Sequence, residues 1–181
     1  MKRAVFLDRD GVINKAFVVD GTPTPAQTLD QLEILPKVAE ALEMLRSAGF
    51  EIVVVTNQPD VARGQLLREA VDSIHERLGR ELNIEHFYTC LHDDADNCPC
   101  RKPKPGLLTL ASKELGIDLR SSFMVGDRWR DIAAGQAIGC ECFFIDYSYS
   151  EQQPQPPYIK VSSLFEAVQM IQEEVHDPIG K

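Results

Sequence analysis

The sequence predicts an α/β fold in which helices cover both faces of a parallel β-sheet. Four short apolar runs, each followed by polar or turn residues, have the composition of buried strands: residues 3–7, 51–55, 121–125 and 141–145. Amphipathic helical patterns alternate with these runs along the chain. This alternation favours a parallel sheet, because each crossover helix packs back onto a face of the sheet.

The helical segments are predicted from apolar residues spaced three and four apart and from residues that begin or end helices. Pro36 opens one such segment and Gly49 closes it. The last segment begins with serines that can cap a helix. We expect helices at residues 36–49, 66–82, 106–116, 130–139 and 162–175.

Length and composition are those of one soluble domain, expected to span residues 1–181. No apolar run is long enough to cross a bilayer. The N-terminal segment reaches Asp8 too soon for a signal peptide, so a cytoplasmic location is the default expectation. The stretch 147–158 is of low complexity and is expected to be a loop before a last strand and the last helix. Residues 176–181 are expected to form a loose tail.

The net charge of −9 argues against broad binding to nucleic acids or to anionic membranes. Both of those partners need a basic surface. A local basic pocket for a small phosphorylated ligand remains compatible with an acidic chain. We therefore expect neither a nucleic acid nor a membrane as partner, and we also expect a monomer.

The predicted strands end in groups able to do chemistry. Asp8 and Asp10 follow the first strand, Thr56 the second and Asp127 the third. Ligands of open α/β sheets bind at the carboxyl ends of the strands, so these groups are expected to meet. Carboxylates brought together repel one another unless a cation joins them, and Mg²⁺ suits carboxylates that act with a phosphate. A single Asp after a strand also suits a turn or a helix cap, but the ordered set favours a Mg²⁺ site.

A second group of potential metal ligands lies within residues 90–100: Cys90, His92, Cys98 and Cys100. Three thiols and an imidazole are a full tetrahedral set for Zn²⁺. Catalytic zinc usually keeps one position open for water, whereas this set would fill all four. The zinc is therefore expected to hold a loop rather than to do chemistry. Cys140 and Cys142 are interpreted as buried apolar residues outside this set.

Four ordered motifs resemble those of the haloacid dehalogenase superfamily of phosphatases: FLDRDG at 6–11, VVVTNQ at 53–58, RKP at 101–103 and VGDRWRD at 125–131. With the cysteine-rich segment before RKP, the chain is similar to the heptose bisphosphate phosphatases and the histidinol-phosphate phosphatases. The similarity runs from about Ala4 to about Ile145. It implies a Rossmann-like three-layer sandwich with a zinc-stapled loop and no large cap domain.

The resemblance also implies a phosphatase mechanism. Asp8 is expected to be the nucleophile that forms an aspartyl-phosphate, and Asp10 the general acid and then the general base. Mg²⁺ is expected to bind the Asp8 side chain, the Asp10 backbone carbonyl and Asp127. Thr56 and Lys102 are expected to bind the transferring phosphoryl oxygens.

Two nearby residues leave alternatives open. Lys104 rivals Lys102, and Lys102 is preferred because it stands in the Cys-Arg-Lys-Pro pattern of the family. Asp131, four residues after Asp127, either supports the metal or the lysine or is an exposed helix charge.

Substrate choice is expected to depend on loops, namely residues 14–25, the stretch 57–64 and the zinc loop. Arg101 could bind a second phosphate or sugar hydroxyls through its planar fork. Arg128 either adds charge to the site or lies on a helix surface. The remaining expected substrate contacts are Asn57, Gln58 and Arg63.

A sugar phosphate or bisphosphate, most specifically a heptose bisphosphate, is the expected substrate, with histidinol phosphate as the alternative. Pro59 and Asp60 depart from the heptose group, and the short gap between His92 and Cys98 is shared with the histidinol group. A second hypothesis is a non-catalytic, zinc-stabilised interaction module. The presence of both Asp8 and Asp10 argues against it, because such a module needs no nucleophile and acid. A nucleic-acid 3′-end phosphatase is opposed by the acidic composition.

Overall fold

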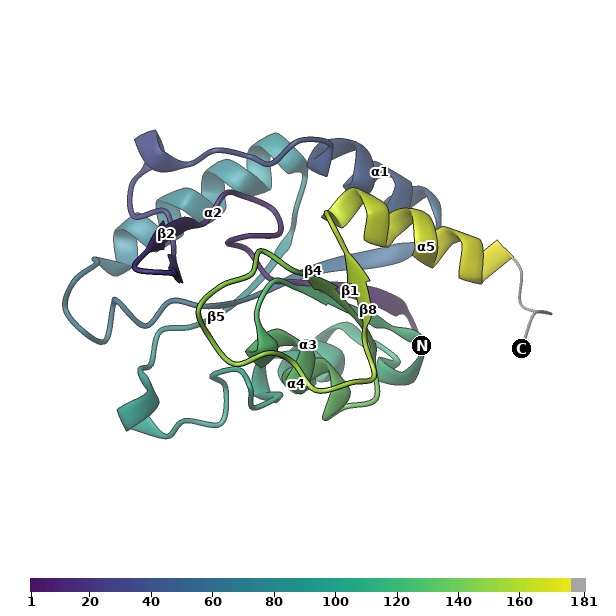
Figure 1. The fold of residues 1–181 in the computed structure, drawn as a ribbon. Helices are drawn as coiled ribbons and strands as arrows, with labels where there is room; N and C mark the ends of the chain where they lie inside the picture. Colours follow the sequence, from purple (N-terminus) through teal and green to yellow (C-terminus); the bar gives the residue numbers. More distant parts are fainter. Residues whose placement is uncertain (177–181) are drawn as a thin grey trace.

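The computed structural model of the protein describes residues 1–176, and within them a six-stranded sheet forms the centre of the fold (Figure 1). All of its strands run parallel, in the order β5-β4-β1-β6-β7-β8. The strands are β1 (Arg3–Leu7), β4 (Phe50–Asn57), β5 (His86–Cys90), β6 (Phe123–Gly126), β7 (Glu141–Ile145) and β8 (Ile159–Val161). The predicted parallel sheet is confirmed.

The described residues contain five α-helices in two layers, one on each face of the sheet (Figure 1). They are α1 (Val38–Ser47), α2 (Arg68–Leu82), α3 (Gly106–Leu115), α4 (Trp129–Gln136) and α5 (Leu164–His176). Helices α1, α2 and α5 lie on one face, and α3 and α4 on the other. Short 3₁₀ turns occur at Leu29–Gln31, Asp94–Asp96 and Leu119–Ser121. The five predicted helices are confirmed, with ends that differ by at most three residues.

Strand β1 shows why the sheet requires helices on both faces. Its residues from Ala4 to Leu7 are buried, and alternate side chains point to opposite sides. Val5 packs in the core under α1, α2 and α5, whereas Phe6 packs in the core over α3 and α4. A strand that is apolar on both faces can be stable only between two helical layers.

Helix ends follow local backbone chemistry. Helix α2 stops at Asn83 and α3 at Gly116, both in the left-handed conformation with φ of 52° and 69°. At the start of α5, Ser163 accepts a hydrogen bond from the backbone N–H of Glu166 (3.2 Å). The predicted serine cap is therefore Ser163.

Sequence reasoning missed two elements. The pattern of apolar runs does not predict strand β5 at the edge of the sheet, although its sequence HFYTC contains aromatic and β-branched residues and follows the end of α2. A two-stranded antiparallel hairpin, β2 (Phe17–Val19) with β3 (Thr22–Thr24), lies within residues 14–25, which the sequence predicts to be a loop. Both elements bear on the site, because β5 ends at Cys90 and the hairpin leads into residues that line a pocket.

The remaining segments are irregular or lie outside the described residues. Residues 147–158 contain no helix or strand, as predicted. Of the expected tail, His176 ends α5 and residues 177–181 lie outside the described part. In residues 1–176 no helix is long and apolar enough to cross a membrane.

The order of the strands creates a crevice at the middle of the sheet. The chain passes from β1 to its neighbour β4 on one side and later returns to β6 on the other side. In open α/β sheets such a reversal separates the connecting loops at the carboxyl ends of the strands, and ligands bind there.

Candidate active site

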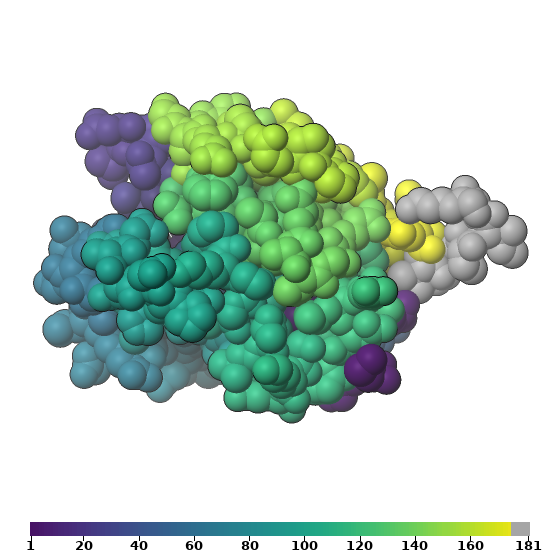
Figure 2. Space-filling model, turned by 90° about the horizontal axis from the view of Figure 1, so that it is seen from below, coloured from purple at the N-terminus to yellow at the C-terminus, as the bar shows by residue number. Residues whose placement is uncertain are grey.

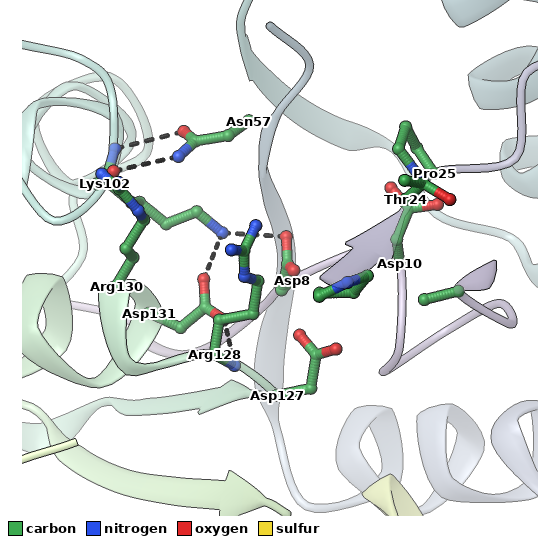
Figure 3. A pocket seen from close by; sticks show the side chains of 12 residues that line it. Asp8, Asp10, Thr24, Pro25, Asn57, Lys102, Asp127, Arg128, Arg130 and Asp131 are labelled. Atoms are coloured by element: carbon green, nitrogen blue, oxygen red, sulfur yellow. Dashed lines mark hydrogen bonds and ion pairs between the residues drawn. The ribbon is translucent and has the colours of Figure 1, made fainter. Parts of the chain in front are cut away.

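A small pocket opens at the carboxyl ends of β1, β4 and β6 (Figure 3). Asp8 and Asp10 follow β1, Asn57 ends β4, and Asp127 follows β6. Its lining comprises Asp8, Asp10, Ala16, Pro23, Thr24, Pro25, Asn57, Lys102, Asp127, Arg128, Arg130 and Asp131. The crevice therefore brings together groups from segments far apart in the chain.

Lys102 is the buried cation of this pocket, with a relative exposure of 1%. Its ammonium donates to Asp8 Oδ1 (2.8 Å) and to the carbonyl of Val55 (2.7 Å), and lies 2.6 Å from Asp131 Oδ1. Lys104, the rival lysine, instead binds the carbonyls and side chain of the loop at Asn97 and Cys98. The geometry therefore favours Lys102 as the lysine of the site.

Three carboxylates converge beside Lys102 and form what we call the carboxylate cluster: Asp8, Asp127 and Asp131. Burial, followed by the charge of Asp131, raises the pKa of Asp8 to about 6. Burial, followed by the charges of Asp8 and Asp131, raises the pKa of Asp127 well above its ordinary value. Lys102 thus pairs with two of the three buried acids, Asp8 and Asp131, and a bound cation would relieve the remaining repulsion.

The donor atoms of this cluster fit a hard divalent cation. Asp127 Oδ1 is buried and has no hydrogen-bond partner among the described residues. Asp131 is less available, because its Oδ1 contacts Lys102 and its Oδ2 accepts from the backbone N–H of Arg128 (3.0 Å). Oxygen atoms of Asp8 and Asp127 are therefore suited to Mg²⁺, and Asp131 to holding the lysine.

Two glycines permit this close packing. Gly11 has a φ of +87°, and a Cβ there would lie 2.0 Å from Asp127 Oδ2. A Cβ at Gly126 would lie 2.1 Å from the Cβ of Asp131. Larger residues at either position would displace a carboxylate of the cluster.

Asp10 lies in the same pocket, and its carboxylate is held by donors. Arg9, itself fully buried, donates to both of its oxygens (3.1 and 3.2 Å). Asn14 and Gln58 donate to one oxygen each, at 3.0 and 2.9 Å. The side chain is therefore fixed in orientation next to Asp8.

The end of β4 supplies groups that organise the site. Thr56 is buried, and its hydroxyl accepts from Gln58 (2.9 Å). Gln58 is also fully buried and binds Asp10, so its position favours orienting the acid over touching a substrate. The Asn57 amide lines the pocket and bonds both the N–H and the carbonyl of Lys102 (3.1 and 3.0 Å). Asn57 thus fixes the backbone that carries the lysine.

The three arginines expected to contact substrate occupy different places. Arg128 lines the pocket and is paired with Glu151. Arg101 lies outside the lining and binds Asp94 (2.9 Å). Arg63 also lies outside it. Its partners are Asp60 and Asp93.

Arg130 is a pocket residue that sequence reasoning missed. Its guanidinium lies 3.2 Å from Asp94 Oδ1, so Arg130 and Arg101 share one carboxylate. Helix α4 begins at Trp129, directly after the strand end that carries Asp127. Residues in the first turn of a helix that starts at the crevice face the ligand, and that rule could have identified Arg130.

The second set of potential ligands, which we call the thiolate cluster, comprises Cys90, His92, Cys98 and Cys100. Its sulfur atoms lie 3.2–3.6 Å apart, and His92 Nδ1 is 3.3 Å from the sulfur of Cys100. The ligand atoms all lie within 4.8 Å of one another, which suits one tetrahedral ion. Cys140 and Cys142 are buried elsewhere, in the core over α3 and α4.

Comparisons with known proteins agree with this geometry. A family model described as haloacid dehalogenase-like hydrolase matches residues 16–139. The chain is 37% identical over 147 residues to D-glycero-beta-D-manno-heptose-1,7-bisphosphate 7-phosphatase of Pasteurella multocida, covering 75% of this chain and 77% of the relative. It is 30% identical over 183 residues to the corresponding enzyme of Photorhabdus laumondii, named for the alpha anomer, covering 94% and 97%.

A solved structure gives the same result at the level of the fold. D,D-heptose 1,7-bisphosphate phosphatase from B. bronchiseptica, complexed with magnesium and phosphate, superimposes with a TM-score of 0.84. The sequences are 27% identical, and the match covers 95% of this chain and 99% of that one. The family match, the related sequences and this shared fold agree, and the chain therefore belongs to the haloacid dehalogenase-like hydrolases.

Proposed function

We propose that this protein is a Mg²⁺-dependent phosphatase that removes the 7-phosphate of a heptose 1,7-bisphosphate. The observation that carries the proposal is the pairing of Asp8 with buried Lys102 in a pocket that Arg128 and Arg130 also line. Such a pocket offers a nucleophile at its base and positive charge for phosphate groups. The names of the relatives at 30–37% identity support this substrate.

In the first half of the proposed reaction, an Asp8 carboxylate oxygen attacks phosphorus and the ester P–O bond breaks. The sugar leaves as an alkoxide that takes a proton from Asp10, and Asp8 carries the phosphoryl group. Lys102 stabilises the negative charge on the phosphoryl oxygens. The hydroxyl proton of Thr56 is available to donate to such an oxygen, because Gln58 donates to the Thr56 oxygen rather than accepting from it.

In the second half, water attacks the phosphorus of the phosphorylated Asp8. The Asp10 carboxylate takes a proton from this water, and the bond between phosphorus and the Asp8 oxygen breaks. Inorganic phosphate leaves, and both carboxylates return to their starting states. The hydrogen bonds from Arg9, Asn14 and Gln58 keep Asp10 in position for both proton transfers.

Two metals belong to the proposal. Mg²⁺ bound by Asp8, the Asp10 carbonyl and Asp127 would neutralise charge on the phosphoryl group. Zn²⁺ bound by the thiolate cluster would hold the loop that delivers Lys102, which follows the last ligand, Cys100, by two residues.

The charges of the pocket favour a bisphosphate over histidinol phosphate. A bisphosphate presents a second anion, and Arg128 and Arg130 are suited to bind it. Arg101 and Arg130 both pair with the carboxylate of Asp94, so Arg101 lies close to the arginine that lines the pocket. Histidinol phosphate instead presents an ammonium group, which these arginines would repel.

The proposal is tested by phosphate release from three substrates in the presence of Mg²⁺: the alpha and beta anomers of heptose 1,7-bisphosphate and histidinol phosphate. We expect turnover of at least one heptose anomer, with kcat/KM at least about tenfold above that for histidinol phosphate. Faster hydrolysis of histidinol phosphate would overturn the substrate assignment. Absence of turnover with every phosphate ester would favour a non-catalytic module.

A further inference from the structure

The segment that follows β7 contacts the candidate active site at several points. The Tyr147 hydroxyl donates to the carbonyl of Gly11 (3.0 Å), and the Tyr149 hydroxyl donates to Asp127 Oδ2 (2.8 Å). The backbone N–H of Ser150 donates to the carbonyl of Gly21 in the β2–β3 hairpin (2.8 Å). Figure 2 shows this light green segment beside the purple hairpin at the edge of the molecule. The low-complexity stretch is therefore attached to the site.

The two oxygens of Asp127 have different surroundings. Oδ2 accepts from Tyr149 and lies so close to Gly11 that a Cβ there would be 2.0 Å away. Oδ1 is buried and has no hydrogen-bond partner among residues 1–176. The contacts on Oδ2 prevent the carboxylate from rotating and leave Oδ1 as the free ligand atom.

Tyr149 is itself fixed in place by its surroundings, so its hydroxyl can hold Asp127 Oδ2 in one orientation. Its side chain is buried, with 9% relative exposure, and its ring stacks on that of Tyr147 at a centroid distance of 5.5 Å. The backbone contact of the next residue, Ser150, with the hairpin fixes the chain on the other side. A donor fixed in this way holds its acceptor at little further entropic cost.

We propose that Tyr149 is a positioning residue for the Mg²⁺ ligand Asp127, holding Oδ2 so that Oδ1 is directed at the metal. The inference rests on the proposed function, because it assumes that Asp127 binds Mg²⁺. Groups that hydrogen-bond a metal ligand commonly change metal affinity by about 10- to 100-fold when they are removed. Tyr149 is expected to act on metal affinity far more than on the rate of the metal-saturated enzyme.

The test compares Tyr149→Phe with Tyr147→Phe, which removes the hydroxyl of the stacked partner. Mg²⁺ binding is measured by calorimetry on metal-free protein, and kcat with a small aryl phosphate is measured across a Mg²⁺ titration. For Tyr149→Phe we expect a Mg²⁺ dissociation constant about 10- to 100-fold higher, with kcat at saturating Mg²⁺ within about threefold of the parent. For Tyr147→Phe we expect a dissociation constant within about twofold of the parent.

A thermal melt in the absence of metal separates a misfolded variant from a misplaced ligand. A double-mutant cycle with Asp127→Asn provides a second criterion, because Tyr149→Phe should cause no further loss of Mg²⁺ binding once the ligand is gone. Parent-like Mg²⁺ affinity in a folded Tyr149→Phe variant, or equal losses in both tyrosine variants, would overturn the inference. Neither outcome would affect the proposed function, which instead fails if the parent protein binds no Mg²⁺.

Discussion

The carboxylate cluster and the thiolate cluster can each hold a metal ion, but the protein supports them differently. Asp8 and Asp127 directly follow central strands, and Asp131 lies in the first turn of α4. All three are at least nine-tenths buried, and Lys102 pairs with Asp8 and Asp131. The thiolate cluster has only Cys90 on a strand, and its other members lie half-buried or exposed in the following loop. The fold therefore places the carboxylates without a metal, whereas we expect the loop to need the proposed zinc ion for rigidity.

The difference matters because the two clusters meet at Lys102. Its backbone follows the thiolate cluster and is fixed by Asn57, and its ammonium is bound by Asp8 and Asp131. The loop therefore supplies the Lys102 cation, and the sheet supplies Asp8, the proposed nucleophile. Changes in one cluster should leave the other intact while still lowering activity.

The largest effect is expected from Asp8→Asn, which removes the nucleophile. We expect phosphatase activity to fall at least about 10³-fold, because an amide cannot attack phosphorus. Zinc content and the far-UV circular dichroism spectrum should be unchanged, since the thiolate cluster is untouched. Phosphate release within tenfold of the parent rate would contradict the assignment of the nucleophile.

The same variant should reveal the free-energy cost of ionising Asp8 in its buried site. The folded state holds the Asp8 proton more tightly than the unfolded chain, with a pKa raised from 3.8 to about 6, mainly by burial. Metal-free parent protein should therefore lose up to about 3 kcal/mol of stability from this group as pH rises through that window. Asp8→Asn should be more stable than the parent at pH 7 and equal to it near pH 3.

Urea denaturation in the presence of a chelator measures this difference, and Mg²⁺ should stabilise the parent far more than the variant at pH 7. Equal free energies of unfolding of the two proteins at pH 7 without metal would contradict an unfavourable ionised Asp8 in the folded state.

A smaller loss of activity is expected from Cys98→Ala, which removes one of the proposed zinc ligands. The loop should loosen and misplace Lys102, so activity should fall about 10- to 100-fold and proteolysis around residues 90–102 should increase. Added Mg²⁺ should not restore the rate. Cys140→Ala is the matched control, because this thiol is buried outside the cluster and its loss should leave zinc content unchanged.

Metal analysis measures the zinc content of each variant, and limited proteolysis measures cleavage around residues 90–102. Zinc content and kinetics equal to those of the parent in Cys98→Ala would contradict a structural zinc in this loop.

The smallest effects concern the arginines between the two clusters. Arg101→Gln and Arg130→Gln should each lower kcat/KM for the bisphosphate about tenfold more than for a small aryl phosphate, because charged hydrogen bonds are worth about 1.5–3 kcal/mol. Arg63→Gln removes a similar ion pair away from the pocket lining and should change neither value by more than about twofold. Equal losses on both substrates would place Arg101 or Arg130 on the transferring phosphate.

Much of the fold and the centre of the site could be predicted from the sequence. Apolar runs that end in Asp8 and Asp127 are visible as strings of residues, and the sheet topology brings such ends together. The convergence of the thiolate cluster was also predictable, because its ligands are close in sequence. The monomeric state, the cytoplasmic location and the extent of the domain stay predictions.

What could not be predicted depends on contacts between distant segments. Gln58 and Arg101 are both predicted to contact substrate. In the structure Gln58 donates to Asp10 and Arg101 pairs with Asp94, and these partners depend on packing that the sequence does not reveal. Tyr149 lies in a stretch with no periodic pattern, and only its approach to Asp127 gives it a role. Strand β5 escapes prediction because HFYTC is not a continuous apolar run, and four of its five residues are only half-buried at the edge of the sheet.

The most direct test of the two-metal account is one chelation experiment on the purified parent protein. Metal content and phosphatase activity are measured before mild chelation, after it, and after Mg²⁺ is added back. The account predicts about one zinc ion per chain throughout, with activity lost on chelation and restored by Mg²⁺ alone. A protein purified without zinc, or activity that returns only when zinc is added, would contradict it.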